Sequence, residues 1–162
     1  MTHPSPLPAL PVACFANPGA NRMTPYGARR SDIRGADALA QAQHELSQWP
    51  GYAATPLHSL PALAQALGVA AVHYKDEGSR FGLGSFKALG GAYAVARLLC
   101  RELGTRLGRT LSTQDLRTPE LRALCAGITV TCATDGNHGR SVAWGAQQFG
   151  CACVIYIHAT VS

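Results

Sequence analysis

The 162-residue chain contains little charge and almost no lysine. Only 14% of its residues are charged, against about 25% in a typical globular protein, whereas an apolar share of 47% excludes a disordered chain. Its two lysines, Lys75 and Lys87, stand beside twelve arginines, and the formal net charge is +5. The arginines form no long basic block and no aromatic residues are interleaved with them, so we do not predict nucleic-acid binding.

Several ligand-binding signatures are missing as well. The six cysteines include no Cys-x-x-Cys pair, and no group of His, Cys, Asp and Glu has metal-ligand spacing, so we predict no metal site. The sequence has no Gly-Lys-Ser or Gly-Lys-Thr triplet of a nucleotide phosphate loop. No Gly-x-Gly-x-x-Gly opens its last helix, so a dinucleotide site has no direct support.

The chain also lacks the marks of export. Residues 1–16 contain four prolines and no basic residue, which is unlike a secretory signal. Cys132, Cys151 and Cys153 fall in apolar, strand-like segments, where thiols are commonly buried and inert. Residues 141–162 are uncharged, but polar residues and a change of period interrupt them, so we predict no membrane span. These features predict a cytoplasmic protein without disulfides.

The first half of the chain alternates between breakers and short periodic segments. Residues 1–30 are rich in Pro, Gly, Asn and Arg and are interpreted as an irregular N-terminal arm. Apolar spacing predicts a helix over 36–48 that ends at Trp-Pro-Gly, and a shorter one over 61–67 that begins at a proline and ends at Gly68. Residues 69–75 then predict a strand.

The second half predicts two helix-opening loops. A glycine-rich loop over 78–84 leads to Ser85, a good N-cap, and apolar spacing predicts a helix that Gly104 ends. A polar connection follows, with a helix predicted over 118–125.

The pattern of the last unit predicts a strand over 127–133, a turn over 134–139, a helix over 141–149 and a second strand over 151–157. This alternation predicts an α/β fold with an open, mostly parallel, doubly wound sheet. The chain stops where a further helix should cover the last strand, so we interpret it as the N-terminal portion of a longer protein.

Lys87 is the first candidate for chemistry. It lies at the start of the helix behind Ser85, where the helix dipole disfavours an ammonium and favours the free amine that forms Schiff bases. The neighbouring glycines leave backbone donors for an anion. A surface lysine beside a loop is the competing interpretation.

The turn over 134–139 is the second candidate, because open α/β sheets bind ligands at the carboxyl ends of their strands. Asp135 offers a carboxylate for proton transfer, Asn137 offers an amide donor, and the glycines expose backbone N–H groups. An ordinary Asp-Gly turn that caps a helix explains the same residues.

Together, residues 75–93 with Ser-Phe-Lys at 85–87, and residues 134–150 with Asp-Gly-Asn-His at 135–138, resemble a known family. They look like the fold type II (tryptophan synthase β-like) enzymes of pyridoxal 5'-phosphate. Ser-Phe-Lys before a helix is that family's cofactor-lysine motif, and Gly-Asn-His is similar to its asparagine loop. Aspartate before Gly-Asn-His resembles the diaminopropionate ammonia-lyase branch, whereas dehydratases carry a small residue there.

The resemblance implies a role for each matched residue. Lys87 would hold the cofactor covalently and then act as acid and base, and Asn137 would hydrogen-bond the cofactor's ring hydroxyl. Asp135 would transfer protons on the opposite face, which would let both D and L substrates react. Backbone groups near Thr134, Gly136 and His138 would receive the substrate carboxylate.

The implied reaction is α,β-elimination of 2,3-diaminopropionate to pyruvate and ammonia, by a homodimer when full length. Residues 31–104 would be part of the large, lysine-bearing domain, and residues 105–162 an incomplete small domain with the asparagine loop. The family's phosphate-cradling loop and its partner for the pyridine nitrogen lie further along than residue 162, so the chain alone is expected to be inactive. A threonine or serine dehydratase-like lyase, and a non-catalytic fragment or phosphate-ligand binding module, are the alternatives.

Overall fold

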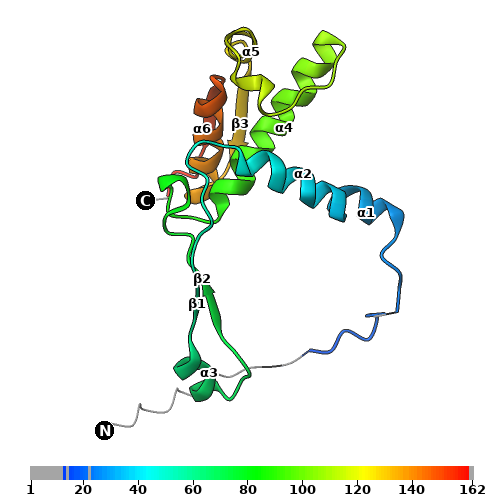
Figure 1. Ribbon diagram of the computed structural model, residues 1–162, viewed down its shortest axis with the longest axis vertical. Coiled ribbons are helices and arrows are strands. Elements are labelled where there is room, and N and C mark those ends of the chain that lie inside the picture. The colour runs from blue at the N-terminus through cyan, green and yellow to red at the C-terminus, as the bar shows by residue number, and fades with distance from the viewer. Residues whose placement is uncertain (1–12, 14, 22, 161–162) are drawn as a thin grey trace.

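The parallel strand–helix–strand unit predicted near the end of the chain is present. In the computed structural model, which describes residues 13, 15–21 and 23–160, β3 (Thr129–Ala133) and β4 (Ala152–Tyr156) pair in parallel and α6 (Asn137–Phe149) connects them (Figure 1). The register runs from Thr129 opposite Ala152 to Ala133 opposite Tyr156. These elements confirm the prediction of an α/β chain with a parallel sheet.

Burial along β3 and β4 follows the two-residue period of a strand. Val130 is buried and Cys132, Cys153 and Ile155 pack partly buried against the core, whereas their neighbours in both strands are exposed. One face of the sheet therefore packs against the rest of the chain and the other face is open.

A second pair of strands was not predicted. β1 (Leu57–Ser59) and β2 (His73–Lys75) pair antiparallel, and α3 (Pro61–Leu67) lies between them in the chain. The strand predicted over 69–75 is too long, because Gly68 ends α3 in the left-handed region and the Val69 N–H still donates to a carbonyl of α3. A three-residue strand is too short to leave a period in the sequence.

The N-terminal arm is partly helical. Residues 15–21 and 23–27 form no helix or strand, as predicted, and residues 1–12, 14 and 22 lie outside the described part. α1 (Ala28–Arg34) begins inside the predicted arm and is followed by α2 (Ala36–Ser47), the helix predicted over 36–48. Gly35 makes this tight junction possible, since a Cβ there would lie 2.3 Å from the Ser31 carbonyl oxygen.

The helix after the glycine-rich loop is longer than predicted. α4 (Lys87–Leu107) continues through Gly104 and ends at Gly108, which has a φ of +64° and donates its N–H to the Gly104 carbonyl. Gly104 does not end the helix. It allows the chain at Arg109 to pack closely against α4, because a Cβ on Gly104 would lie 2.7 Å from the Arg109 carbonyl oxygen. At the other end the N-cap position is Phe86, one residue after the predicted Ser85, although the Ser85 hydroxyl still accepts the Lys87 N–H at 3.2 Å.

Beyond α4 the chain forms two short helices, η2 (Asp115–Arg117) and α5 (Pro119–Cys125). The Thr118 side chain accepts the N–H of Leu121 and caps α5, which confirms the helix predicted over 118–125. The five cysteines in the described part of the chain are free. Within that part, no helix is long and apolar enough to cross a membrane, and no three potential ligands gather to hold a metal ion.

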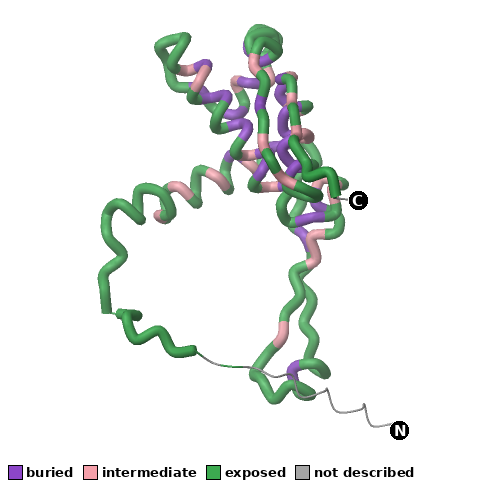
Figure 2. Tube along the Cα trace, turned by 180° about the vertical axis from the view of Figure 1, so that it is seen from behind, coloured by how far each residue is buried: buried purple, intermediate pink, exposed green. Residues whose placement is uncertain are grey.

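The core is built on a close contact between α4 and α6. Ser141 of α6 is fully buried; its hydroxyl donates to the Ala88 carbonyl at 3.1 Å and accepts the Ala92 N–H at 3.0 Å. A Cβ on Gly145 would lie 2.7 Å from the Ala92 Cα, so glycine is required there. Figure 2 shows the buried residues gathered where α4, α6 and β3 meet, whereas α1 and the β1–β2 pair are mostly exposed.

This contact also fixes the direction of the two helices. Ser141 contacts residues 88 and 92 of α4, and Gly145, one turn further along α6, contacts Ala92. Because the contacts advance along both helices in the same direction, the helices run parallel and their N-termini lie at the same end of the core (Figure 1).

Candidate functional site

A pocket of about 540 Å³ lies where α4 and α6 begin. Gly84, Ser85 and Phe86 line it from the start of α4, and Asn137, the first residue of α6, lines it from the other helix. The end of β2 and the following loop complete the wall with Tyr74, Lys75, Glu77 and Gly78. The pocket therefore joins the two segments that the sequence singled out.

The predicted site residues are placed around this pocket in different ways. Asn137 lines it, and Lys87 directly follows the lining residue Phe86. The Lys87 side chain is exposed, and so are Asp135 and His138, none of which lines the pocket. The structure thus brings Asn137 to the glycine-rich loop, whereas Asp135 lies outside the lining of the pocket, before α6.

The turn before α6 is shorter than predicted, because Asn137, His138 and Gly139 already belong to the helix. Gly136, directly before the helix, has a φ of +63° and a ψ of −135°, a conformation that suits only glycine. Gly139 faces β4, where a Cβ would lie 3.0 Å from Ile155 Cγ2. These two glycines set Asn137 at the helix start, close above the sheet.

The backbone N–H of Thr134 already has a hydrogen-bond partner at the end of the parallel strand pair. This N–H donates to the Tyr156 carbonyl at 3.0 Å, and the Thr134 hydroxyl donates to the Asp135 carbonyl at 3.3 Å. The first helical hydrogen bond of α6 runs from the Arg140 N–H to the Gly136 carbonyl, so the N–H groups ahead of it have no partner within the helix. An anion at this end of α6 would therefore be bound by N–H groups of the residues that follow Gly136, and not by the Thr134 N–H.

Phe81 holds the glycine-rich loop against α6. It has a φ of +49°, the one positive value on a non-glycine residue in the described part of the chain. Left-handed backbone on a bulky residue costs about 1–3 kcal/mol and must be supported by packing. The Phe81 ring stacks on Trp144 of α6 at 4.7 Å between centroids and lies 6.2 Å from Trp49. Aromatic packing thus fixes the loop that leads to Lys87.

An ion pair that the sequence did not reveal anchors the same loop. Arg80 lies in η1 (Arg80–Gly82) with only 5% of its surface exposed, and its Nε and Nη2 donate to the two carboxylate oxygens of Glu77 at 2.7 and 3.0 Å. Arg80 also donates to the Ala53 carbonyl at 2.7 Å and to the Thr55 hydroxyl at 3.1 Å. The sequence signal that could have indicated this pair is the Glu-x-x-Arg spacing of residues 77–80, in a chain that contains few charged residues.

This pair determines the charge of the pocket wall. The hydrogen bond from Arg80 lowers the pKa of Glu77 to about 2, and Thr55 and Lys75 act in the same direction. Glu77 is therefore ionised at every physiological pH, and the buried guanidinium balances its charge. Lys75, the cation that lines the pocket, donates to the Thr55 carbonyl at 2.5 Å.

Glu77→Gln is expected to lower the free energy of unfolding by about 1–3 kcal/mol at neutral pH, because it leaves the buried Arg80 without its counter-charge. The folded-state pKa is depressed from 4.5 to about 2, so the pair stabilises the fold above pH 4.5 and loses this effect as the pH falls to 2. Urea unfolding of both proteins at pH 7, 5 and 3.5 measures the difference.

Glu102→Gln is the matched control, because Glu102 is 45% exposed and only 3.5 Å from the exposed Arg101. Its effect is expected within about 0.5 kcal/mol at each pH. A Glu77→Gln difference that stays constant from pH 7 to 3.5 would contradict this account of the pair.

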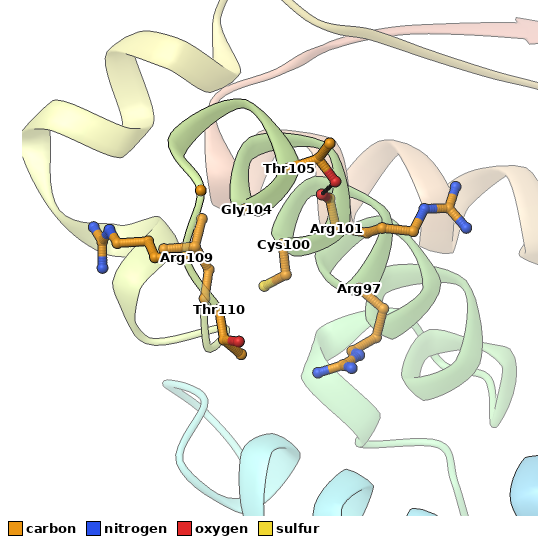
Figure 3. A pocket seen from close by; sticks show the side chains of 9 residues that line it. Arg97, Cys100, Arg101, Gly104, Thr105, Arg109 and Thr110 are labelled. Carbon is orange, nitrogen blue, oxygen red and sulfur yellow. Dashed lines mark hydrogen bonds between the residues drawn. The ribbon is translucent and has the colours of Figure 1, made fainter.

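A second pocket, of about 560 Å³, lies beside the C-terminal half of α4, away from the predicted site. Figure 3 shows Cys100 at its centre, while Arg101 and Arg109 extend away from it in opposite directions. Burial raises the pKa of the Cys100 thiol to about 11, so the thiol is not a nucleophile at neutral pH. The arginines do not converge, and this pocket has no evident chemistry.

The starts of α4 and α6 share an electrostatic feature. Neither helix has an acidic residue in its first turn, and each has a cation there: Lys87 in α4 and Arg140 in α6. Two helix N-termini, an amine, an amide and loop glycines suit an anionic ligand with a group that can react with an amine.

A known family matches the part of the chain that contains this pocket. Residues 48–162 match the family model described as "Pyridoxal-phosphate dependent enzyme". The match covers more than half of the chain, and the chain belongs to this family.

The similar curated proteins are more specific. Diaminopropionate ammonia-lyase of Salmonella typhimurium (strain LT2) is 48% identical over 108 residues, which are 67% of this chain and 26% of that protein. The enzyme of the same name from Escherichia coli (strain K12) is 49% identical over 107 residues, which cover 66% of this chain and 26% of that protein. The chain thus spans about a quarter of the length of these relatives.

Solved structures of a diaminopropionate ammonia lyase are also similar to this chain. The holo form of the Escherichia coli diaminopropionate ammonia lyase superposes with a TM-score of 0.66 at 41% identity, over 78% of this chain and 31% of that one. Its complex with D-serine superposes with a TM-score of 0.65 at the same identity and coverage. These similarities confirm the predicted fold class and the family resemblance.

Proposed function

We propose that this chain contains the cofactor-lysine and asparagine segments of a pyridoxal-phosphate ammonia-lyase that converts 2,3-diaminopropionate to pyruvate and ammonia. The observation that supports this most is the pocket in which Ser85 and Phe86, directly before Lys87, face Asn137. Membership of the family supports the cofactor, and the similar ammonia-lyases support the substrate.

The residues around the pocket fit pyridoxal 5'-phosphate by their chemistry. Lys87 offers an amine for its aldehyde, Asn137 offers an amide for its ring hydroxyl, and the polarised helix starts favour its negative charge. When bound, the cofactor draws electrons from the α-carbon of an amino acid and makes the α-proton acidic. We assign covalent attachment of the cofactor to Lys87, and afterwards the taking and returning of a proton through its Nζ.

The residues of the asparagine loop would bind the substrate and transfer a second proton. The N–H groups at the start of α6 that have no partner within the helix, near Gly136 and His138, would receive the substrate carboxylate, and Thr134 would support this turn through its hydrogen bond to the Asp135 carbonyl. Asp135, exposed before the helix, would exchange protons on the side opposite Lys87. Acid–base groups on both faces would allow both enantiomers of the substrate to react.

Asp135 distinguishes the ammonia-lyase from a threonine or serine dehydratase, the second candidate. In the intact protein (the longest natural polypeptide that contains these residues), Asp135→Asn is expected to reduce turnover of one enantiomer of diaminopropionate by about 10²–10⁴-fold and of the other far less. Release of the 2-oxo acid measures this: pyruvate from D- and L-diaminopropionate and from serine, and 2-oxobutanoate from threonine.

Asp37→Asn, an exposed acid in the first turn of α2, is the control and should leave all rates unchanged. Equal losses on both enantiomers would contradict the two-base assignment. Faster turnover of threonine or serine than of either diaminopropionate would favour the dehydratase. An intact protein that binds the cofactor but releases no 2-oxo acid from any of the four substrates would favour a non-catalytic binding module.

Three broader features stay proposals. The resemblance supports a homodimer, and the free cysteines of the described chain are compatible with a cytoplasmic protein. The division into a lysine-bearing part over 31–104 and an asparagine-loop part over 105–162 rests on the same resemblance. Light scattering of the intact protein would test the first of these by its mass in solution.

A further inference from the structure

Arg140 is a cation in the first turn of α6 whose side chain reaches back to Asn137. Its Nη1 donates to Asn137 Oδ1 at 3.3 Å, across one helical turn. In the described part of the chain, no carboxylate pairs with Arg140, and this is the one side-chain hydrogen bond that it makes.

Helix stability does not explain an arginine at this position. A cation in the first turn opposes the helix dipole, typically by about 0.3–1 kcal/mol, and α6 has no acidic residue there to compensate. Arg140 is exposed, so it fills no space in the core. Its contact with a pocket-lining side chain is the feature that remains to be explained.

The contact has a chemical consequence for the Asn137 amide. A carboxamide has an accepting oxygen at one end and a donating NH₂ at the other. With the oxygen held by Arg140, the NH₂ group is the end left for a ligand in the pocket that Asn137 lines. The nearby guanidinium also polarises the amide and strengthens its N–H groups as donors.

We propose that Arg140 is a positioning residue that fixes the Asn137 amide with its NH₂ group presented to the ligand. The inference rests on the proposed function for the identity of that ligand, pyridoxal 5'-phosphate. A fixed donor selects an accepting, negatively charged oxygen, which is the form of the cofactor's ring hydroxyl that the amide would stabilise.

The test compares Arg140→Met, which keeps the length and removes the donor, with Arg140→Lys, which restores a donor. In the intact protein, Arg140→Met is expected to weaken cofactor binding by about 3–20-fold and to shift the pH midpoint of the cofactor's visible absorption. Arg140→Lys should recover part of both effects. Arg101→Met, which removes an exposed arginine of α4, should change neither.

A second measurement does not need the cofactor. In cofactor-free protein labelled with ¹⁵N-asparagine, the Asn137 side-chain resonances, assigned through Asn137→Ser, are expected to move in Arg140→Met and stay in Arg101→Met. If both the amide resonances and the absorption midpoint are unchanged in Arg140→Met, the positioning role is wrong, even if Lys87 binds the cofactor. If the wild-type protein binds no cofactor, the proposed function fails, and the amide resonances alone decide whether Arg140 fixes Asn137.

Discussion

Lys87→Ala is expected to abolish covalent attachment of pyridoxal phosphate and to lower pyruvate release from diaminopropionate by at least about 10³-fold in the intact protein. The amine is the group that bonds the aldehyde, and the other lysine of the chain, Lys75, already donates to the Thr55 carbonyl. The visible absorption of the bound cofactor and the steady-state rate measure the two effects. A Lys87→Ala protein that retains both would contradict the assignment.

Lys75 provides the matched control. It is the other lysine of the chain, and it lines the same pocket from β2. Its Nζ donates to the Thr55 carbonyl beside the Arg80–Glu77 pair, which assigns it to the anchoring of the loop. Lys75→Arg, which keeps the charge and the donor, is expected to retain the absorption and most of the activity. Loss of the cofactor in Lys75→Arg, but not in Lys87→Ala, would exchange the two assignments.

Gly145→Ala is expected to lower the free energy of unfolding by about 2–4 kcal/mol, although alanine is the better helix former. The new methyl group would lie 2.7 Å from the Ala92 Cα and 3.2 Å from the Ala92 carbonyl oxygen. Backbone cannot turn aside as a flexible side chain can, so α6 must move away from α4 and the Ser141 hydrogen bonds must lengthen. Urea unfolding measures the loss.

The control substitutes an equivalent glycine on the open side of the same pair of helices. Gly90 is exposed on α4, and a Cβ there would meet nothing within 4 Å. Gly90→Ala is expected to stabilise the protein by about 0.5–1 kcal/mol, through the lower entropy of the unfolded chain. If both variants shift stability in the same direction and by the same amount, the close contact does not determine the packing of α4 on α6.

Gly145→Ala also links the core to the site. The parallel crossing of α4 and α6 is what brings Lys87 and Asn137 to one end of the molecule. A displaced α6 should therefore weaken cofactor binding in the fraction of Gly145→Ala protein that remains folded.

The sequence predicted the elements that have their own period or cap. α3 begins at Pro61 and ends at Gly68, α5 begins behind the capping Thr118, and the strand–helix–strand unit follows its apolar pattern. These features are local, so they can be recognised without knowledge of the rest of the fold.

The elements that were missed depend on distant contacts. β1 is defined by its pairing with β2 across α3, and α4 continues past Gly104 because the returning chain packs on that glycine. The hydrogen bonds from Arg80 to Ala53 and Thr55 and the stacking of Phe81 on Trp144 join segments that no periodicity relates. The sequence therefore predicts candidate residues for the chemistry, but not how the glycine-rich loop is held against α6.

The most direct test of the account is the position of the covalent bond to the cofactor. Borohydride reduction of the cofactor-loaded intact protein, followed by proteolysis and mass spectrometry, should place the pyridoxyl group on Lys87 alone. A pyridoxyl group on Lys75, or on no residue of this chain, would contradict the assignment of this site.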